Sequence, residues 1–228
     1  MQHLTKLPLP KALEDSSIRN SILEITQESY SNPSVLLEQE FEKNNEIYMS
    51  FSSDERLDAF FMVGWSKLLL NARYVDCVFL GLSAVRAERK GGSLAVRLYR
   101  AFFSDADAVS MSSGLPVAWW FHTASPIVAG VMWRIASDIG PRMDGHLSIS
   151  QQQLLTSIQA KHDFTRHRDV EIPFVLRGIA KARYAPLEVA RLDSRRARQE
   201  SPLEKWRVDE AAGDRALFVG QCSPPSGN

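Results

Sequence analysis

The feature that most constrains this chain is an uninterrupted strand, turn and helix between residues 77 and 104. Residues 77–85 are apolar at nearly every position, which is typical of a central strand covered on both faces. A basic turn with Gly91 and Gly92 follows, and large apolar side chains then recur every four positions, which predicts a helix over residues 92–104. This order brings backbone N–H groups and a helix N-terminus to one point, and such a point binds phosphate or pyrophosphate.

Two common phosphate-binding motifs are excluded at this turn. A P-loop has two glycines five positions apart followed by Lys and Ser or Thr, and the sequence contains no such run. A dinucleotide-binding fingerprint has three glycines at fixed offsets, which Gly91 and Gly92 do not supply. The alternative to a phosphate site is an ordinary connection from strand to helix with a solvated basic corner.

Composition narrows the range of partners. The chain has 228 residues, and its 27 basic and 27 acidic side chains give a formal net charge of zero. No overall field favours nucleic acid or an anionic membrane, so we expect neither as a partner. Two cysteines, Cys77 and Cys222, do not form a disulfide framework, which favours a cytoplasmic location. We find no signal peptide in residues 1–10 and no window with the roughly 20 apolar residues of a membrane span, so we expect a soluble protein.

Apolar periodicity and turn residues divide the chain into helices and strands. They predict helices over residues 15–30, 34–43, 92–104, 126–138, 150–162 and 186–200. They predict strands over residues 46–53, 57–67, 77–85, 115–123, 172–177 and 215–221, with a loop at residues 71–76. Meandering strands are thus followed by alternating strands and helices. That order is typical of an α/β (α+β) fold with a mixed central sheet and helices on both faces.

The segment from Leu82 to Ala95 resembles the GNAT superfamily of acyl-CoA-dependent N-acyltransferases, as do the element order around it and the strand–helix pair at residues 115–138. The family motif is Arg or Gln, two residues, Gly, one residue, then Gly or Ala. Arg89 and Gly92 match this motif, whereas Leu94 departs from it. The resemblance implies a mostly antiparallel mixed sheet in which two central strands splay apart.

The same resemblance implies where an acyl-CoA would bind. The pantetheine arm would lie between strands 77–85 and 115–123 and pair with the main chain like an added strand. The N–H groups of residues 89–94 would wrap the pyrophosphate at the positive end of the next helix. The cofactor-binding residues implied in this way are Ser83, Ala84, Val85, Arg89, Lys90, Gly91, Gly92, Ser93 and Leu94. The bulk of Leu94 leaves open a carrier-protein thioester as the donor.

The catalytic residues are harder to assign. Many family members use a Glu on the central strand as base and a Tyr in the helix after the second splayed strand as acid. Residues 77–85 contain no carboxylate, and residues 130–136 contain Trp133 and no Tyr. We therefore assign catalysis to His122, because an imidazole titrates near neutrality, and to Thr123 as an oxyanion donor. The alternatives are that His122 is structural and that Thr123 belongs to a helix cap.

These observations predict an enzyme that transfers an acyl group, acetyl first of all, from acyl-CoA to the amine of a small molecule by direct attack on the thioester. No metal is expected, since His162, Asp163 and His167 match no metal-site pattern. One alternative is a synthase of N-acyl amino acids or acyl-homoserine lactones that uses an acyl carrier protein, which a basic helix face would dock. That face comprises Arg191, Arg195, Arg196 and Arg198. Another alternative is a catalytically inactive module that binds acyl-CoA.

The domain organisation follows from the same element order. We expect residues 1–222 to form a single GNAT-like acyltransferase domain. Its extended C-terminal region, residues 145–222, is either a lid over the acceptor site or additional core. Residues 223–228 are rich in Pro, Ser and Gly and are expected to be a disordered tail. A homodimer is left open.

Overall fold

The computed structural model describes residues 3–196 and 201–224 and is built around one large β-sheet. Seven strands follow the order β1-β3-β4-β5-β6-β9-β7, and a separate ladder joins β2 to β8. The strands are β1 (His3–Pro8), β2 (Tyr30–Ser31), β3 (Glu46–Phe51), β4 (Leu57–Leu70), β5 (Arg73–Val85), β6 (Val117–Thr123), β7 (Val175–Leu176), β8 (Arg183–Tyr184) and β9 (Arg215–Cys222). Only β5 and β6 are parallel neighbours in the large sheet. The expected mixed, mostly antiparallel sheet is confirmed.

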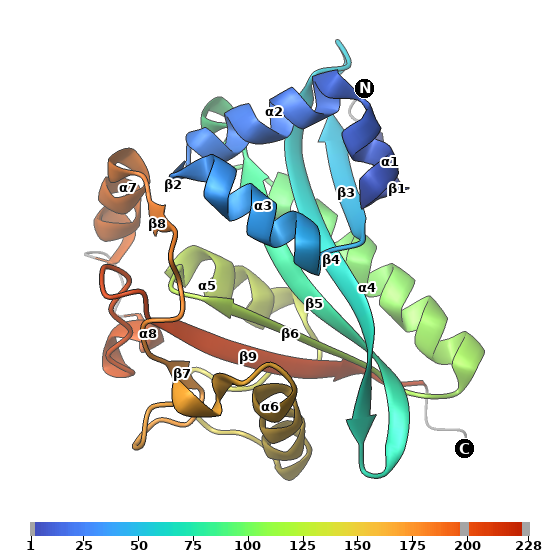
Figure 1. Ribbon diagram of the computed structural model, residues 1–228, viewed down its shortest axis with the longest axis vertical. Coiled ribbons are helices and arrows are strands. Elements are labelled where there is room, and N and C mark those ends of the chain that lie inside the picture. The colour runs from blue at the N-terminus through green and yellow to red at the C-terminus, as the bar shows by residue number, and fades with distance from the viewer. Residues whose placement is uncertain (1–2, 197–200, 225–228) are drawn as a thin grey trace.

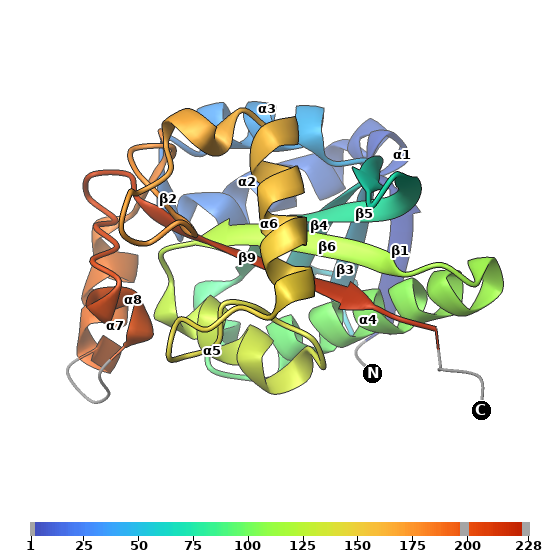
Figure 2. The same ribbon diagram turned by 90° about the horizontal axis from the view of Figure 1, so that it is seen from below.

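Helices cover both faces of this sheet, as expected. They are α1 (Leu9–Glu14), α2 (Ser16–Gln27), α3 (Pro33–Lys43), α4 (Leu94–Ser113), α5 (Pro126–Ile135), α6 (Ile149–Lys161), α7 (Pro186–Arg196) and α8 (Pro202–Lys205). Figure 1 shows α2 and α3 in front of the strands, and Figure 2 shows α4 and α5 on the opposite side. Two short 3₁₀ turns, Ala87–Arg89 and Phe164–Arg166, complete the described secondary structure.

Two apolar cores hold these layers together. The smaller core packs Ile22 and Ile25 of α2 and Leu37 of α3 against the sheet, and all three side chains are buried. Helix α2 begins at Ser16 because the preceding Asp15 carboxylate accepts the amides of Ser17 and Ile18, at 2.8 and 3.3 Å. The larger core lies under α4, α5 and α6. Burial of these apolar stripes fixes the helices that flank the site.

The two parallel strands separate along their length. Strands β5 and β6 pair only from Asp76 opposite Val117 to Phe79 opposite Trp120. Beyond that point β5 continues to Val85 beside β4, and β6 continues to Thr123 beside β9. A register shift between β4 and β5 bends β5 where the separation begins. The expected splaying of the central strands is confirmed.

Several element boundaries differ from the sequence-based expectation, and three of the differences are large. Residues 3–8 form the edge strand β1, which the prolines near its end concealed, although Pro is tolerated at a sheet edge. The expected loop at residues 71–76 is wrong, because β4 and β5 form a long hairpin that turns on Asn71 and Ala72, both with positive φ. Helix α4 ends nine residues later than expected, at Ser113 rather than residue 104, before Gly114 with φ of 66°.

The C-terminal region contributes to the core. Leu154 and Ile158 of α6 and Leu217 of β9 are fully buried. The expected strand at residues 172–177 is reduced to β7, and the expected helix at 186–200 is seen as α7 up to Arg196. Residues 197–200 of that helix and 225–228 of the expected tail lie outside the described residues. Within the described part of the chain, no helix combines the length and apolar character needed to cross a membrane.

Candidate active site

A cavity of about 490 Å³ lies where β5 and β6 separate. Tyr99 of α4 and Met132 of α5 line it on one side of the sheet. Glu40 of α3, together with Trp120 and His162, lines it on the other side. Because residues from both faces share one cavity, the gap between the strands connects the two sides of the sheet.

The turn after β5 presents a row of backbone amides without acceptors. The first α-helical hydrogen bond of α4 runs from the Arg97 amide to the Ser93 carbonyl, at 2.9 Å, so the amides of residues 94–96 have no partner within the helix. The amides of residues 91–93 also donate to no acceptor that the described residues provide. Gly91 has φ of 92°, a conformation that favours glycine. Six consecutive amides at a helix N-terminus form a site for an anion.

The cationic side chains of the same turn already pair with carboxylates. Arg89 Nε lies 3.2 Å from the buried Asp58 carboxylate. Lys90 Nζ lies 2.9 Å from Glu188 and donates to the Ser29 hydroxyl. A negatively charged ligand at the turn would therefore be held by amides more than by these two side chains. Pyrophosphate binding by Arg89, Lys90 and the residues after them stays a prediction.

Leu94, the residue that departs from the family motif, faces away from the turn. Its side chain is 5% exposed and packs into the larger core. The turn itself is open, since a Cβ at Gly92 would meet only the Arg89 carbonyl oxygen, at 3.4 Å. The bulk of Leu94 therefore does not obstruct an anion at the amides of Gly91 and Gly92.

Residues 83–85 form a strand edge beside the gap, and Ser83 at its start lines the cavity. Ser83, Ala84 and Val85 pair with β4 on one side, and β6 has left on the other. The Ser83 hydroxyl lies 2.6 Å from that of Tyr99. An extended arm that carries amide groups could add to this edge as a strand does. Such pairing with Ser83, Ala84 and Val85 stays a prediction.

His122 lines the cavity at the end of β6, beside the rings of Phe79 and Trp120. Burial, with a smaller effect of the Arg215 and Lys43 charges, lowers the pKa of His122 to about 3. The imidazole is therefore neutral at physiological pH and only weakly basic. Its Nδ1 is buried and has no hydrogen-bond partner among the described residues. A catalytic role for His122 stays a prediction, and the structure suits a hydrogen-bonding role better than that of base.

Two histidines, His122 and His162, should make the free energy of unfolding depend on pH. Burial also lowers the pKa of His162, to about 4. The unfolded chain binds protons below the ordinary histidine pKa of 6.5, whereas the folded chain does not, so the free energy of unfolding should fall as pH drops below that value. Replacing both His122 and His162 by Gln should reduce this loss, measured by urea unfolding between about pH 7 and pH 4.5. Equal losses in the variant and the original protein would contradict this account.

Thr123 takes part in the helix cap that the sequence offered as an alternative. Its Oγ1 accepts the amide of Ser125 at 3.0 Å, and the Ser125 hydroxyl accepts the Val128 amide at 3.3 Å. Thr123 also lines the cavity, as does Tyr184. Its function as an oxyanion donor stays a prediction beside this structural role.

Sequence reasoning missed a buried carboxylate in the cavity. Glu40 of α3 is 5% exposed, and its Oε2 accepts the Leu82 amide at 3.0 Å and the Asn44 side chain at 3.1 Å. Leu82 lies at the irregularity of β5, beyond the last residue paired with β6. Burial raises the pKa of Glu40, which is opposed by the charge of Lys43. The signal available in the sequence was a carboxylate three residues after Leu37, on the apolar stripe of its helix.

Three tyrosines that the sequence analysis did not consider also line the cavity: Tyr30, Tyr99 and Tyr184. Burial raises the pKa of all three phenols, that of Tyr99 to about 12. Trp133, at the position where the family places a Tyr, instead donates to the Pro141 carbonyl oxygen at 2.9 Å. Phenol groups thus reach the cavity from α4, β2 and β8 rather than from α5.

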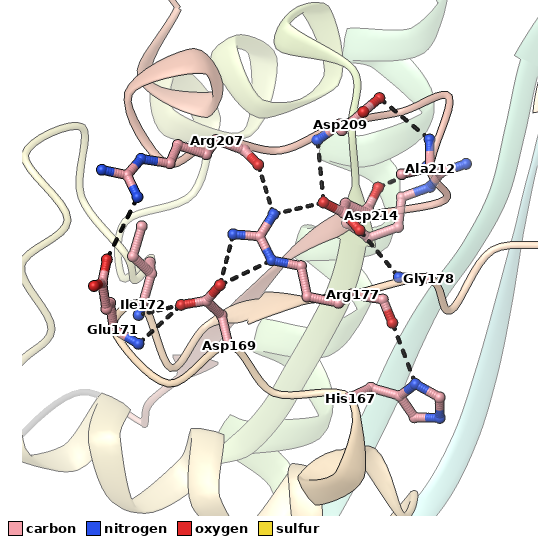
Figure 3. Close-up of polar contacts among 11 residues, drawn as sticks. His167, Asp169, Glu171, Ile172, Arg177, Gly178, Arg207, Asp209, Ala212 and Asp214 are labelled. Carbon is pink, nitrogen blue, oxygen red and sulfur yellow. Dashed lines mark hydrogen bonds and ion pairs between the residues drawn. The ribbon is translucent and has the colours of Figure 1, made fainter.

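Arg177 lies at the centre of a network of polar contacts in the C-terminal region (Figure 3). The Arg177 guanidinium lies 2.6 Å from Asp169 and 2.5 Å from Asp214 and donates to the Arg207 carbonyl oxygen. It joins the loop before β7 to the loop before β9. The aromatic face of Tyr184 in turn lies under Arg215, which is buried.

Replacing Arg177 by Met should destabilise the fold by about 2–4 kcal/mol, because the buried carboxylate of Asp214 would lose its cation. The measurement is urea unfolding at neutral pH. The matched control is Arg166→Met, since Arg166 is 81% exposed and pairs only with exposed Asp163, at 3.8 Å. Equal urea midpoints for Arg177→Met and Arg166→Met would show that the Arg177 network contributes little to the free energy of unfolding.

The basic face proposed for a carrier protein is described only in part. Arg191 lies 2.8 Å from Glu188, which also holds Lys90. Arg198 and the side chains of Arg195 and Arg196 lie outside what the structure describes. Docking of an acyl carrier protein therefore stays a prediction.

Comparison with known proteins shows which solved structures share the fold of this chain. No protein-family model matches the chain, and no curated protein matches it in sequence. The ribosomal-protein-S18-alanine N-acetyltransferase from Escherichia coli is similar in structure, with a TM-score of 0.51 and 9% identity over 100% of this chain and 98% of that one. At that identity the likeness concerns the fold alone, and at that level the resemblance to GNAT acetyltransferases is confirmed.

Two further solved structures share part of the architecture. A probable N-acyltransferase from Enterococcus faecalis V583 has a TM-score of 0.42 and 10% identity over 57% of this chain. The chain spans only 31% of the length of that protein. A GNAT family N-acetyltransferase from Escherichia coli in complex with CoA has a TM-score of 0.42 and 13% identity over 59% of this chain and 67% of that one.

Proposed function

We propose that this protein is an N-acyltransferase that moves an acyl group, acetyl first of all, from the thioester of acyl-CoA to the amine of a small molecule. The observation that carries this proposal is the separation of β5 from β6, with a cavity of about 490 Å³ at the gap. The amides of residues 91–96, at the start of α4, donate to no acceptor among the described residues. An extended arm bearing a pyrophosphate fits this combination of a strand edge and an anion site.

The residues that would hold the donor belong to two groups. The edge formed by Ser83, Ala84 and Val85 would bind the amide groups of the arm, and the amides of residues 91–96 would bind its phosphates. The thioester supplies an activated acyl carbon when bound. The remaining tasks of the chain are to hold the amine near this carbon, to remove its proton and to exclude water.

Glu40 is the group best placed to take the proton of the amine. It is the carboxylate that the described residues contribute to the cavity lining, and it is fixed at Leu82, beside the gap. Its raised pKa makes its carboxylate a stronger base than an exposed glutamate. An incoming ammonium group would pass its proton to Glu40 and attack as the neutral amine.

The leaving thiolate needs a proton donor, and the cavity offers phenols for that task. Tyr99 and Tyr184 are both protonated at neutral pH, since an ordinary phenol has a pKa of 10.0 and burial raises the pKa of these two. Tyr184 and Thr123 both line the cavity, and Thr123 stands at the end of β6. His122 would donate or accept a hydrogen bond as a neutral imidazole.

The proposal is tested by measuring thiol release from acetyl-CoA and octanoyl-CoA across a panel of amino acids, simple amines and aminoglycosides. We expect release that depends on the amine, and a melting temperature that rises with CoA concentration by mass action. A raised melting temperature without thiol release for any amine would indicate a binding module instead. No shift with CoA and no release would refute the proposal.

A further inference from the structure

The side chains that line the cavity carry more positive than negative charge. Lys43, Lys161, Lys181 and Arg215 line it, and Glu40 is the sole carboxylate that the described residues place there. Arg215 is compensated, since it donates to backbone carbonyls and lies 3.6 Å from Glu210. Lys161 differs, because it donates to the Ser66 hydroxyl and to the Lys67 carbonyl oxygen, both neutral groups. An anion bound in this part of the cavity could therefore pair with the Lys161 ammonium without displacing a carboxylate.

Lys43 and Lys161 flank the same short stretch of β4. The Lys43 carbonyl oxygen approaches Gly64 so closely that a Cβ there would lie 2.1 Å from it. Lys161 Nζ lies 2.9 Å from the hydroxyl of Ser66, two residues further along. Gly64 and Ser66 both line the cavity. The two lysines, at the ends of α3 and α6, therefore both lie next to this stretch of β4.

Lys43 and Glu40 place two opposite charges on the cavity lining, at a spacing similar to that of the two charges of an α-amino acid. The Lys43 ammonium lies 3.7 Å from the Glu40 carboxylate, one helical turn away. The ammonium and carboxylate of an α-amino acid are carried by one carbon atom, so they are separated by a similar distance. Such a molecule can pair its ammonium with Glu40 and its carboxylate with Lys43, which replaces one ion pair by two.

Aromatic rings form the next part of the cavity. The Trp120 ring centroid lies 4.5 Å from that of Phe79 and 4.6 Å from that of His162. Phe164 packs against Trp120 and His162, at 5.8 Å from each. All four rings line the cavity. They offer an apolar or aromatic side chain a surface to pack on.

From these contacts we infer that the acceptor is an α-amino acid with a large apolar or aromatic side chain, whose carboxylate binds Lys43 and Lys161. Its ammonium then faces Glu40 and the gap between β5 and β6, and its side chain packs among the rings of Trp120 and Phe164. This inference rests on the proposed acyl transfer and names the substrate class for the same site.

The test compares four amines at saturating acetyl-CoA: L-phenylalanine, L-phenylalaninamide, 2-phenylethylamine and glycine. We expect kcat/KM to be at least about tenfold higher for L-phenylalanine than for each of the others, because each lacks one group that the cavity binds. Lys43→Met and Lys161→Met should each raise KM for L-phenylalanine about tenfold. Lys161→Met should leave 2-phenylethylamine unaffected, whereas Lys43→Met also removes the cation paired with Glu40 and is compared by KM for L-phenylalanine alone. The matched control is Lys67→Met, a lysine that pairs with Asp76 and does not line the cavity.

The outcomes separate this inference from the proposed function. Thiol release with 2-phenylethylamine that equals or exceeds release with L-phenylalanine would overturn the inference and leave acyl transfer standing. Equal values of kcat/KM for glycine and L-phenylalanine would overturn the assignment of the rings. Calorimetry of L-phenylalanine binding without a donor is a second readout, which does not depend on turnover. Binding no tighter than that of L-phenylalaninamide, or unchanged in Lys43→Met, would overturn the inference whatever the activity.

Discussion

Replacing Glu40 by Gln is expected to lower kcat about 10²–10⁴-fold, which is the usual contribution of a general base. Gln keeps an oxygen for the Leu82 amide, so the geometry of the cavity should survive. Neutralising a buried carboxylate whose pKa is raised should leave the melting temperature at pH 7 equal or higher. The rise in melting temperature caused by CoA should be unchanged, since Glu40 does not lie at the amide turn.

The pH dependence of the unaltered protein provides an independent check on Glu40. Its kcat/KM should fall as pH drops through a value above 4.5, the ordinary glutamate pKa, because protonated Glu40 accepts no proton. Glu38→Gln is the matched control, as Glu38 lies on the same helix and is exposed. Loss of activity in Glu38→Gln equal to that in Glu40→Gln would contradict the assignment. So would an acid limb that persists in Glu40→Gln.

Replacing Gly92 by Asp is expected to weaken CoA binding about 100-fold. A carboxylate about 5 Å from the pyrophosphate costs about 3 kcal/mol per unit charge at an effective dielectric constant near 20. The side chain fits, since the nearest atom to a Cβ at Gly92 is the Arg89 carbonyl oxygen at 3.4 Å. Calorimetry gives the dissociation constant directly.

Gly92→Asn separates charge from shape in this experiment, because Asn has the size of Asp and no charge. We expect Gly92→Asn to bind CoA within about threefold of the unaltered protein, which corresponds to less than about 1 kcal/mol. If Asp and Asn weaken binding equally, then no anion lies at the amides of residues 91–96. Arg89→Ala is a weaker test, because Arg89 already pairs with Asp58. Its loss would also remove a cation from the buried Asp58 carboxylate.

The elements around the proposed donor site could be placed from the sequence because they are local. The strand, the glycine turn and the start of α4 lie within about 20 residues of one another, so apolar runs and turn residues suffice to place them. The helix stripe of α2 and the cap at Ser125 were readable for the same reason. The separation of β5 from β6 followed from the family resemblance and not from any pattern within the strands.

The acceptor side could not be predicted, because its residues meet only in the folded chain. Glu40, Lys161 and Tyr184 come from α3, α6 and β8, and no sequence spacing relates them. The family resemblance places a Glu base in residues 77–85 and a Tyr acid in residues 130–136. The first segment contains no carboxylate and the second contains no Tyr. His122 was chosen for its ordinary pKa, yet burial lowers that pKa to about 3, which only the three-dimensional surroundings determine.

The most direct test of the central claim is a set of backbone amide chemical shifts recorded by NMR as CoA is added to the isotope-labelled protein. The account predicts that the amides of residues 91–96 shift most, together with those of residues 82–85 along the edge of β5. Shifts confined to other parts of the chain, with these two segments unchanged at saturating CoA, would contradict it.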